Sequence, residues 1–226
     1  MRRFLVNAPA EGDSQAVKLY GFPPTRSIRV FWTLRELDVE FEFVNVDPGK
    51  GELRRPEFLA VNAAGKLPAL VDGDFVLTES VAICLYLAEK YPERGLLPSE
   101  LRARAEVYRW LLFTATELEQ PLWRMTRHAL LYPPEKRIAA EIPIAREDFV
   151  DMAAVMEKHM DGRQFLVGDD VTVADFVAAY TLDMASVRKG GSLLENLPHL
   201  RGYMERMYAR PKAPPRIAEA FASLRR

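Results

Sequence analysis

The feature that most restricts the fold is a proline set among apolar residues where a strand is expected to begin. The stretch runs Asn62-Ala63-Ala64-Gly65-Lys66-Leu67-Pro68-Ala69-Leu70. Proline lacks a backbone N–H and is normally kept out of sheet interiors, so Pro68 is expected at a sheet edge, at a bulge or after a cis peptide bond. A turned backbone there would leave the N–H and C=O of Leu67 free to pair with an extended ligand. An ordinary loop before an edge strand is the alternative.

Composition narrows the class of protein. The chain has 226 residues, enough for two modest domains or one large one, with 49% hydrophobic and 28% charged residues. A net charge of −1 argues against nucleic-acid binding, which depends on neutralising phosphates. The apolar runs are shorter than the roughly 20 residues of a membrane span, and the polar residues after Val6 argue against a signal peptide. One cysteine suits a reducing compartment. We therefore expect a soluble cytoplasmic protein that binds neither nucleic acid nor membrane.

The first part of the chain predicts a small mixed sheet with helices on its faces. Residues 1–16 resemble a loose leader, and the Asp72-Gly73-Asp74 turn indicates a hairpin. A helical crossover between the first two strands implies that they pair in parallel. The expected elements of this domain, residues 17–91, are strands near 16–22, 41–46, 67–71 and 75–77, and helices from Ser27, near 56–60 and from Thr78-Glu79-Ser80.

The rest of the chain predicts helices only. Residues 92–99 contain Gly95 and Pro98 and indicate a linker before an all-helical domain of residues 100–226. Pro121 is expected to end or kink the long helix that begins near residue 101. Thr172-Val173-Ala174-Asp175 has the form of an N-terminal capping box. Asp175 is therefore interpreted as a structural cap rather than a catalytic carboxylate. Further helices are expected up to Gly162, near 197–209 and near 212–224.

From about residue 17 onward the chain resembles the cytosolic glutathione transferase family, in its bacterial type with a serine/threonine active-site loop. The motifs that carry the resemblance occur in the family's order. They are Lys18-Leu19-Tyr20-Gly21, Arg29-Val30, Asn62 with Gly65 to Leu70, Thr78-Glu79-Ser80, Ile83 with Tyr86-Leu87, and Gly168 with Thr172 and Ala174-Asp175. The resemblance implies a thioredoxin-like α/β first domain, an all-α second domain and a homodimer with glutathione as co-substrate.

Residue by residue, the resemblance places a glutathione site in the first domain. Leu67–Pro68 matches the family's cis-proline position, where the backbone pairs with the cysteinyl part of glutathione. Glu79 and Ser80 match the residues that hold the γ-glutamyl end, and a helix start independently favours a carboxylate. Simple helix capping is the alternative for Glu79 and Ser80. Lys66 could meet a ligand carboxylate, or be an ordinary solvated loop lysine.

The group that activates the thiol is less well defined by the residues. A hydroxyl donor at a helix N-terminus is the expected means of lowering the pKa of a thiol from about 8.5. Counting back from Arg29-Val30, the position of the family's serine in several classes is Pro24, which cannot donate. Thr25 is the first hydroxyl in the loop and our first choice, with Ser27 second; capping by Thr25 is the alternative. Cys84 lies in an apolar helix and is interpreted as inert core.

The second substrate is expected to be a small electrophile. Weak candidates for its pocket are Phe113, Glu117 and Trp123, although an aromatic stripe at helical spacing is more often core. The histidines show no metal-ligand spacing, and no metal is assigned.

Two functions follow from the resemblance. The first is an enzyme that activates glutathione for attack on an electrophile, or for reduction of a peroxide or disulfide. The second is a non-catalytic binding or scaffold protein on the same fold, which the proline at position 24 keeps open.

Overall fold

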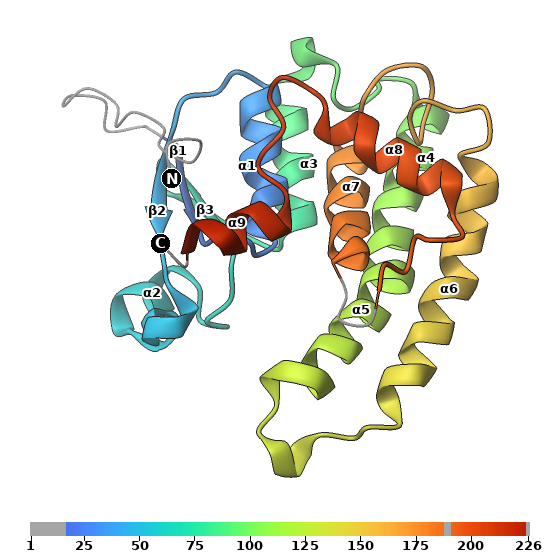
Figure 1. Cartoon of the computed structure of the whole chain (residues 1–226). Coiled ribbons are helices and arrows are strands. Elements are labelled where there is room, and N and C mark those ends of the chain that lie inside the picture. The colour runs from blue at the N-terminus through green and yellow to red at the C-terminus, as the bar shows by residue number, and fades with distance from the viewer. Residues whose placement is uncertain (1–16, 188–190, 225–226) are drawn as a thin grey trace. The chain divides into compact units, whose positions relative to one another are not determined.

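The computed structural model describes residues 17–187 and 191–224, and the expected leader lies outside them. Two compact units make up the chain (Figure 1). The first contains the described residues up to Leu97 together with those from Tyr208 onward, and the second is Pro98–Met207.

The first unit is built on a four-stranded mixed sheet in the order β2-β1-β3-β4. The inner strand β1 is parallel to β2 and antiparallel to β3, and β3 is antiparallel to β4. In Figure 1 the helices α1 and α3 lie side by side on the sheet. The elements are β1 (Val17–Gly21), α1 (Ser27–Glu36), β2 (Phe41–Asn45), α2 (Pro56–Val61), β3 (Ala69–Asp72), β4 (Phe75–Thr78), α3 (Ser80–Lys90) and α9 (Ile217–Leu224), with 3-10 turns at Pro48–Lys50, Glu52–Arg54 and Pro92–Arg94.

The strand register brings three loops to one end of this sheet. Tyr20 of β1 pairs with Ala69 of β3, and Ala69 pairs with Thr78 of β4. Because both pairs are antiparallel, the end of β1, the start of β3 and the end of β4 share one edge of the sheet. The loop after Gly21, the Leu67–Pro68 segment and the start of α3 therefore lie next to one another.

Hydrophobic burial explains the layers. The strand β1 alternates, with Val17, Leu19 and Gly21 buried between half-buried neighbours, as expected for a strand with one face on a core. Residues 27–34 of α1 are all buried. Among them the rings of Phe31 and Phe41 meet edge to face, with centroids 5.6 Å apart.

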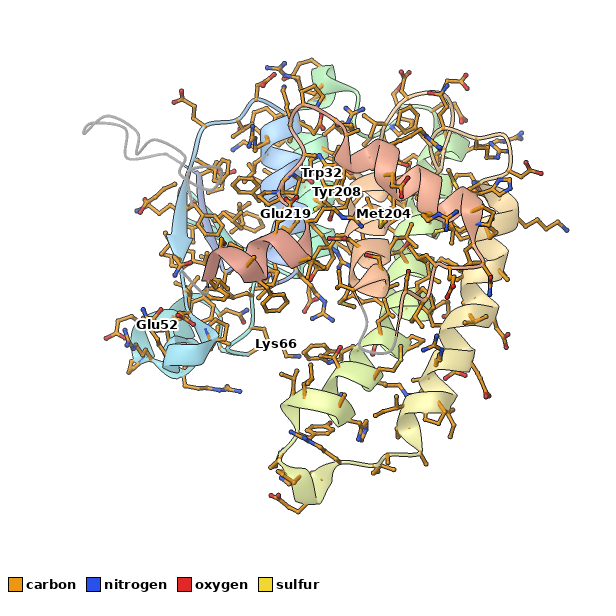
Figure 2. The ribbon with its side chains drawn as sticks, in the orientation of Figure 1. Trp32, Glu52, Lys66, Met204, Tyr208 and Glu219 are labelled. Carbon is orange, nitrogen blue, oxygen red and sulfur yellow. The ribbon has the colours of Figure 1, made fainter. Side chains whose placement is uncertain are left out.

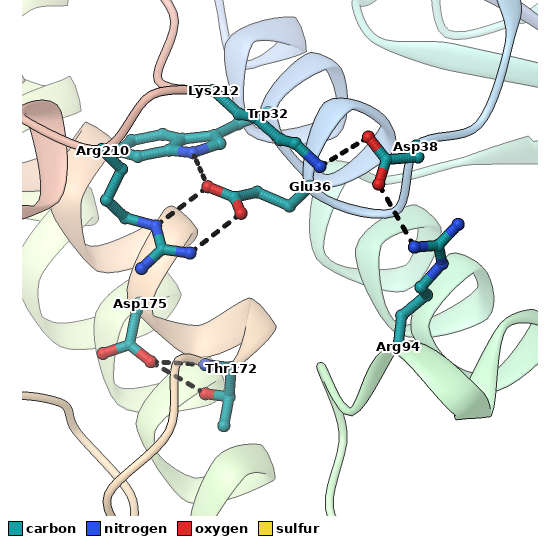
Figure 3. A network of polar contacts seen from close by, with 8 residues as sticks. All are labelled: Trp32, Glu36, Asp38, Arg94, Thr172, Asp175, Arg210 and Lys212. Carbon is teal, nitrogen blue, oxygen red and sulfur yellow. Dashed lines mark hydrogen bonds and ion pairs between the residues drawn. The ribbon is translucent and has the colours of Figure 1, made fainter.

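The C-terminal segment is held on α1 by charge pairs (Figure 3). Arg210 donates from Nε and Nη2 to the two carboxylate oxygens of Glu36, each at 2.9 Å, and Trp32 Nε1 donates to the same carboxylate at 3.1 Å. Just beyond the helix, Asp38 pairs with Lys212 and, at 3.2 Å, with Arg94. The helical pattern near 212–224 predicts a helix of the second domain but says nothing about which unit that helix contacts, and the structure groups this segment with the first unit.

The second unit consists of helices packed in pairs, α5 on α6 and α4 on α7. Pro121 neither ends nor starts its helix: it lies within α5, which follows directly on the π-helix η5. A π-turn widens the helix where a proline removes a backbone donor, and such turns are recognised sites of bending. The elements are α4 (Leu101–Phe113), η5 (Thr114–Leu118), α5 (Glu119–Thr126), η6 (Arg127–Leu131), a 3-10 turn (Pro134–Lys136), α6 (Glu141–His159), α7 (Val173–Ser186) and α8 (Pro198–Tyr208).

The start of α7 depends on one buried carboxylate. Asp175 accepts from the N–H of Thr172 at 2.8 Å (Figure 3), from the N–H of Leu166 at 2.9 Å and from the hydroxyl of Tyr203 at 2.7 Å. Burial raises the pKa of Asp175, and the four hydrogen bonds that it accepts, one of them from the Thr172 hydroxyl, oppose that shift. The carboxylate thus joins the loop at Leu166, the start of α7 and the helix α8.

Replacing this carboxylate should destabilise the protein strongly. Asp175→Ala leaves buried donors without an acceptor and is expected to cost about 2–4 kcal/mol of unfolding free energy. Urea unfolding followed by circular dichroism measures the change. Asp169→Ala, at an exposed loop position, is the control and should stay within about 0.5 kcal/mol. Equal effects of the two substitutions would contradict the role given to Asp175.

Candidate functional site

The Leu67–Pro68 peptide bond is cis. Of the three expectations for Pro68, the cis bond is the one found, and the proline precedes an inner strand rather than an edge strand. The loop before it is held by Asn62, whose side-chain amide donates to the carbonyl of Lys66 at 2.7 Å and accepts from the N–H of Ala64 at 3.0 Å. This loop therefore presents the residue before the proline in a fixed orientation.

Leu67 is positioned to offer its backbone to a ligand. Within the described part of the chain, neither its N–H nor its C=O takes part in the turn, loop and strand hydrogen bonds around it. An extended peptide could use both groups as it would use a strand. Next to it Lys66 is exposed (Figure 2), whereas Pro68 is buried.

Gly65 sets how closely this loop approaches the preceding segment. Its φ is +59°, and an added Cβ would lie 2.8 Å from the carbonyl oxygen of Leu53. A side chain at this position would therefore clash with backbone as well as adopt a left-handed conformation that only glycine adopts freely.

The start of α3 is the second part of the site. Glu79 precedes the helix with a φ of +69°, which is uncommon for a residue other than glycine, and its side chain makes no capping hydrogen bond. The first N–H groups of the helix consequently have no side-chain cap and favour an anion. Ser80 is 5% exposed and its hydroxyl accepts from Nη1 of the buried Arg29 at 3.2 Å. Arg29 thus fixes the first residue of α3 from α1.

The loop between β1 and α1 is the third part. The hydroxyl oxygens of Thr25 and Ser27 lie 2.7 Å apart. Ser27 is 1% exposed, and its Oγ is also 3.1 Å from both the N–H and the carbonyl of Phe22. Thr25 is only half-buried. Of the two predicted hydroxyls, Thr25 is therefore the one with a surface to offer to a ligand.

The three weak candidates for the second substrate lie in the other unit. Phe113 ends α4 and packs edge to face on Trp110, with centroids 5.3 Å apart. Glu117 is exposed in η5 and accepts from the hydroxyl of Thr116 at 3.0 Å. Trp123 is half-buried in α5. Their role stays a prediction.

Two supporting residues were missed by the sequence analysis as parts of the site. Asn62, 7% exposed, holds the loop before Pro68, and Arg29, 1% exposed, holds Ser80. An asparagine two residues before a turn amide is a usable signal for the first. A charged residue within a run of apolar helix positions is the signal for the second, although it does not identify the partner.

The described residues hold no group of three or more His, Cys, Asp or Glu side chains arranged to bind a metal ion. Across the same part of the chain, none of the helices combines the length and apolar character that crossing a membrane requires.

Comparison with known proteins identifies the family. Residues 15–89 match the family described as glutathione S-transferase, N-terminal domain, and residues 113–211 match glutathione S-transferase, C-terminal domain. Glutathione S-transferase F10 of Arabidopsis thaliana is 33% identical over 81% of this chain and 88% of its own length. Glutathione S-transferase 3 of Zea mays is 35% identical over 86% of this chain and 90% of its own.

Solved structures of glutathione transferases have the same fold as this chain. The glutathione transferase URE2P8 from Phanerochaete chrysosporium, with oxidized glutathione, has a TM-score of 0.80 at 25% identity and covers 96% of this chain and 97% of its own. A glutathione transferase family member from Pseudomonas fluorescens, with two glutathione bound, has a TM-score of 0.82 at 25% identity over 91% and 93% of the two chains.

The chain belongs to the glutathione S-transferase family. The resemblance drawn from the motifs is confirmed, as are the thioredoxin-like α/β unit and the helical unit. The bacterial type, the serine/threonine loop and the roles of single residues stay predictions.

Cys84, the only cysteine of the chain, lies within α3 and is fully buried. Burial raises the pKa of its thiol to about 11, while the hydroxyl of Thr33, 3.3 Å from Sγ, and the charge of Arg29 act in the opposite direction. Only the thiolate is a good nucleophile. Cys84 is therefore inert in the folded protein.

A thiol reagent should react with Cys84 only after the protein is unfolded. At pH 8 the native thiolate fraction is on the order of one in a thousand for a pKa of about 11, and burial blocks access besides. We expect no labelling by an aromatic disulfide reagent over an hour at pH 8, and one equivalent in denaturant. Prompt labelling of the native protein would show that Cys84 is accessible.

Proposed function

We propose that this protein is a cytoplasmic glutathione transferase that binds glutathione in its thioredoxin-like unit and activates the thiol for attack on a small electrophile. The observation that carries the proposal is the strand register, which brings the loop of Thr25, the cis Leu67–Pro68 bond and the start of α3 to one end of the sheet. These are the segments to which the family resemblance assigns the sulfur, the cysteinyl backbone and the γ-glutamyl end.

Glutathione would be bound mainly by backbone and charge. The free N–H and C=O of Leu67 would pair with the cysteinyl residue, as an added strand does. The uncapped start of α3, with Ser80, would hold the γ-glutamyl carboxylate, and Glu79 would pair with its ammonium group. Lys66 would meet the second carboxylate. Fixing the tripeptide in this way would place its sulfur next to the loop of Thr25.

Activation requires that the thiolate be favoured over the thiol. The hydroxyl of Thr25 would donate to the sulfur, and a hydrogen bond to the charged form lowers the pKa of the thiol. The thiolate then attacks the electrophilic atom, or an oxygen or sulfur atom when a peroxide or disulfide is the substrate. Phe113, Glu117 and Trp123 are proposed contacts of that substrate, and a homodimer is the proposed assembly.

Removing the donor should slow the reaction without preventing binding. Thr25→Val is expected to lower turnover roughly 10- to 150-fold, because a hydrogen bond to a charged group contributes about 1.5–3 kcal/mol. Affinity for glutathione should change less than about threefold, because other residues hold the tripeptide. Conjugation kinetics with a generic aromatic electrophile measure both. Unchanged turnover, with loss in Ser27→Ala instead, would transfer the donor role to Ser27.

Removing the proposed γ-glutamyl contact should weaken glutathione binding and leave turnover nearly unchanged. Ser80→Ala is expected to raise the KM for glutathione roughly 5- to 150-fold, the loss of a contact worth about 1–3 kcal/mol, with kcat changed far less. Ser223→Ala in α9, where the hydroxyl donates to the carbonyl of Ala220 at 2.7 Å, is the matched control. A Ser80 variant with unaltered KM would remove this residue from the site.

A non-catalytic role remains the second candidate because of two observations. Pro24 occupies the position of the serine of several classes, and the Thr25 hydroxyl is hydrogen-bonded to Ser27. Retention on immobilised glutathione, followed by conjugation and peroxidase assays, separates the two functions. Retention without either activity supports a binding protein, and absence of retention contradicts both the glutathione site and the catalytic function.

A further inference from the structure

Ser27 holds an unusual position as the first residue of α1, directly after the loop from β1. Its hydroxyl is buried, with a residue exposure of 1%, and has three polar neighbours. They are the N–H and the carbonyl of Phe22, each 3.1 Å from Oγ, and the hydroxyl of Thr25 at 2.7 Å. Burial prevents Ser27 from touching a ligand itself. Its hydroxyl nevertheless contacts the residue that we assign to the sulfur.

One hydroxyl has one proton, so two hydrogen-bond arrangements are available. In the first, Ser27 donates to the carbonyl of Phe22 and Thr25 donates to Ser27. In the second, Ser27 donates to Thr25, and the proton of Thr25 is free to point away from both. The second arrangement leaves no carbonyl unpaired, because the N–H of Thr25 also donates to the carbonyl of Phe22, at 2.8 Å.

In the second arrangement the surroundings orient Thr25 outward. Its Oγ1 then accepts from the hydroxyl of Ser27 at 2.7 Å and lies 3.4 Å from the N–H of the same residue. With its acceptor side engaged in this way, its own proton points to solvent or to a ligand. The N–H of Phe22 meanwhile donates to Ser27 Oγ and polarises the chain of hydroxyls in the same direction.

The loop is built to keep this contact close. An added Cβ on Gly21 would lie 2.8 Å from Cβ of Ser27 and 2.9 Å from the ring of Phe43. Only glycine therefore permits Ser27 to approach the end of β1.

We propose that Ser27 is a positioning residue: when glutathione binds, its hydroxyl turns from the carbonyl of Phe22 to Thr25 Oγ1, so that Thr25 donates to the sulfur. This inference rests on the proposed function, because it takes Thr25 as the donor. It adds a relay that runs from the N–H of Phe22 through Ser27 and Thr25 to the thiolate.

A double-mutant cycle tests the relay. The full-length protein and its Ser27→Ala, Thr25→Val and doubly substituted variants are titrated with pH in the presence of saturating glutathione, and the ultraviolet absorbance of the bound thiolate is recorded. Ser27→Ala is expected to raise the apparent pKa of the bound thiol and to lower turnover at neutral pH roughly threefold to tenfold, the range of one neutral hydrogen bond. At higher pH its turnover should approach that of the wild type.

Coupling is the decisive result. If Ser27 acts through Thr25, Ser27→Ala has no further effect in the Thr25→Val background. Independent losses that multiply, or an unchanged apparent pKa in Ser27→Ala, overturn the relay while Thr25 keeps its role. Full activity in Thr25→Val overturns the relay together with the donor assignment. Absence of glutathione binding in the wild type overturns the proposed function and the relay with it.

Folding is monitored separately. Unfolding midpoints and glutathione affinity identify a variant that is merely disrupted, and Ser27→Cys provides a second variant that keeps the Cβ and a weak donor. An apparent pKa of the bound thiol in Ser27→Cys that lies between those of the wild type and Ser27→Ala supports the relay. A rise in that pKa equal to the rise in Ser27→Ala, with unchanged glutathione affinity, also supports it. An apparent pKa equal to that of the wild type contradicts it. Thr181→Val, which removes a buried hydroxyl from α7, should leave the bound thiol unaltered.

Discussion

The placement of β3 between β1 and β4 is the constraint on which the candidate site depends. Antiparallel pairing on both sides sends the chain into β3 at the edge where β1 and β4 end. Three segments that are separated in the sequence are thereby brought to one end of the sheet. A slip of one residue in either pairing would reverse the faces of the strand and move all three loops relative to one another. The candidate site thus depends first on the sheet register, which positions its three segments, and only then on the side chains within them.

Much of this arrangement could be predicted from the sequence. The strands around the hairpin, the helix after Ser27 and the capping box at Thr172 follow from local periodicity and local hydrogen bonding, so local residues suffice to find them. Pro68 indicated a sheet edge, a bulge or a cis peptide bond, because proline is restricted to few positions in a sheet. The family motifs then predicted glutathione-binding roles for residues to which hydrophobic periodicity alone assigns no function.

What the sequence could not supply depends on partners distant along the chain. Arg29 reaches Ser80 across 51 positions, and Arg210 reaches Glu36 across 174. No periodicity links such pairs, because their contact is decided by how whole elements pack. The distinction between Thr25 and Ser27 was open for a similar reason. The two hydroxyls are two positions apart in the sequence, and only the structure shows that Ser27 is buried whereas Thr25 is half-buried.

The pairing of Arg210 with Glu36 has a consequence for how the protein is made. The thioredoxin-like unit is continuous in space but discontinuous in the gene, because its final segment is synthesised after the whole helical unit. Folding during synthesis generally proceeds from the N-terminus. During translation α1 therefore emerges long before the C-terminal segment that contacts it. Glu36 has no arginine partner until Arg210 has left the ribosome. The first domain to emerge is the last to be completed.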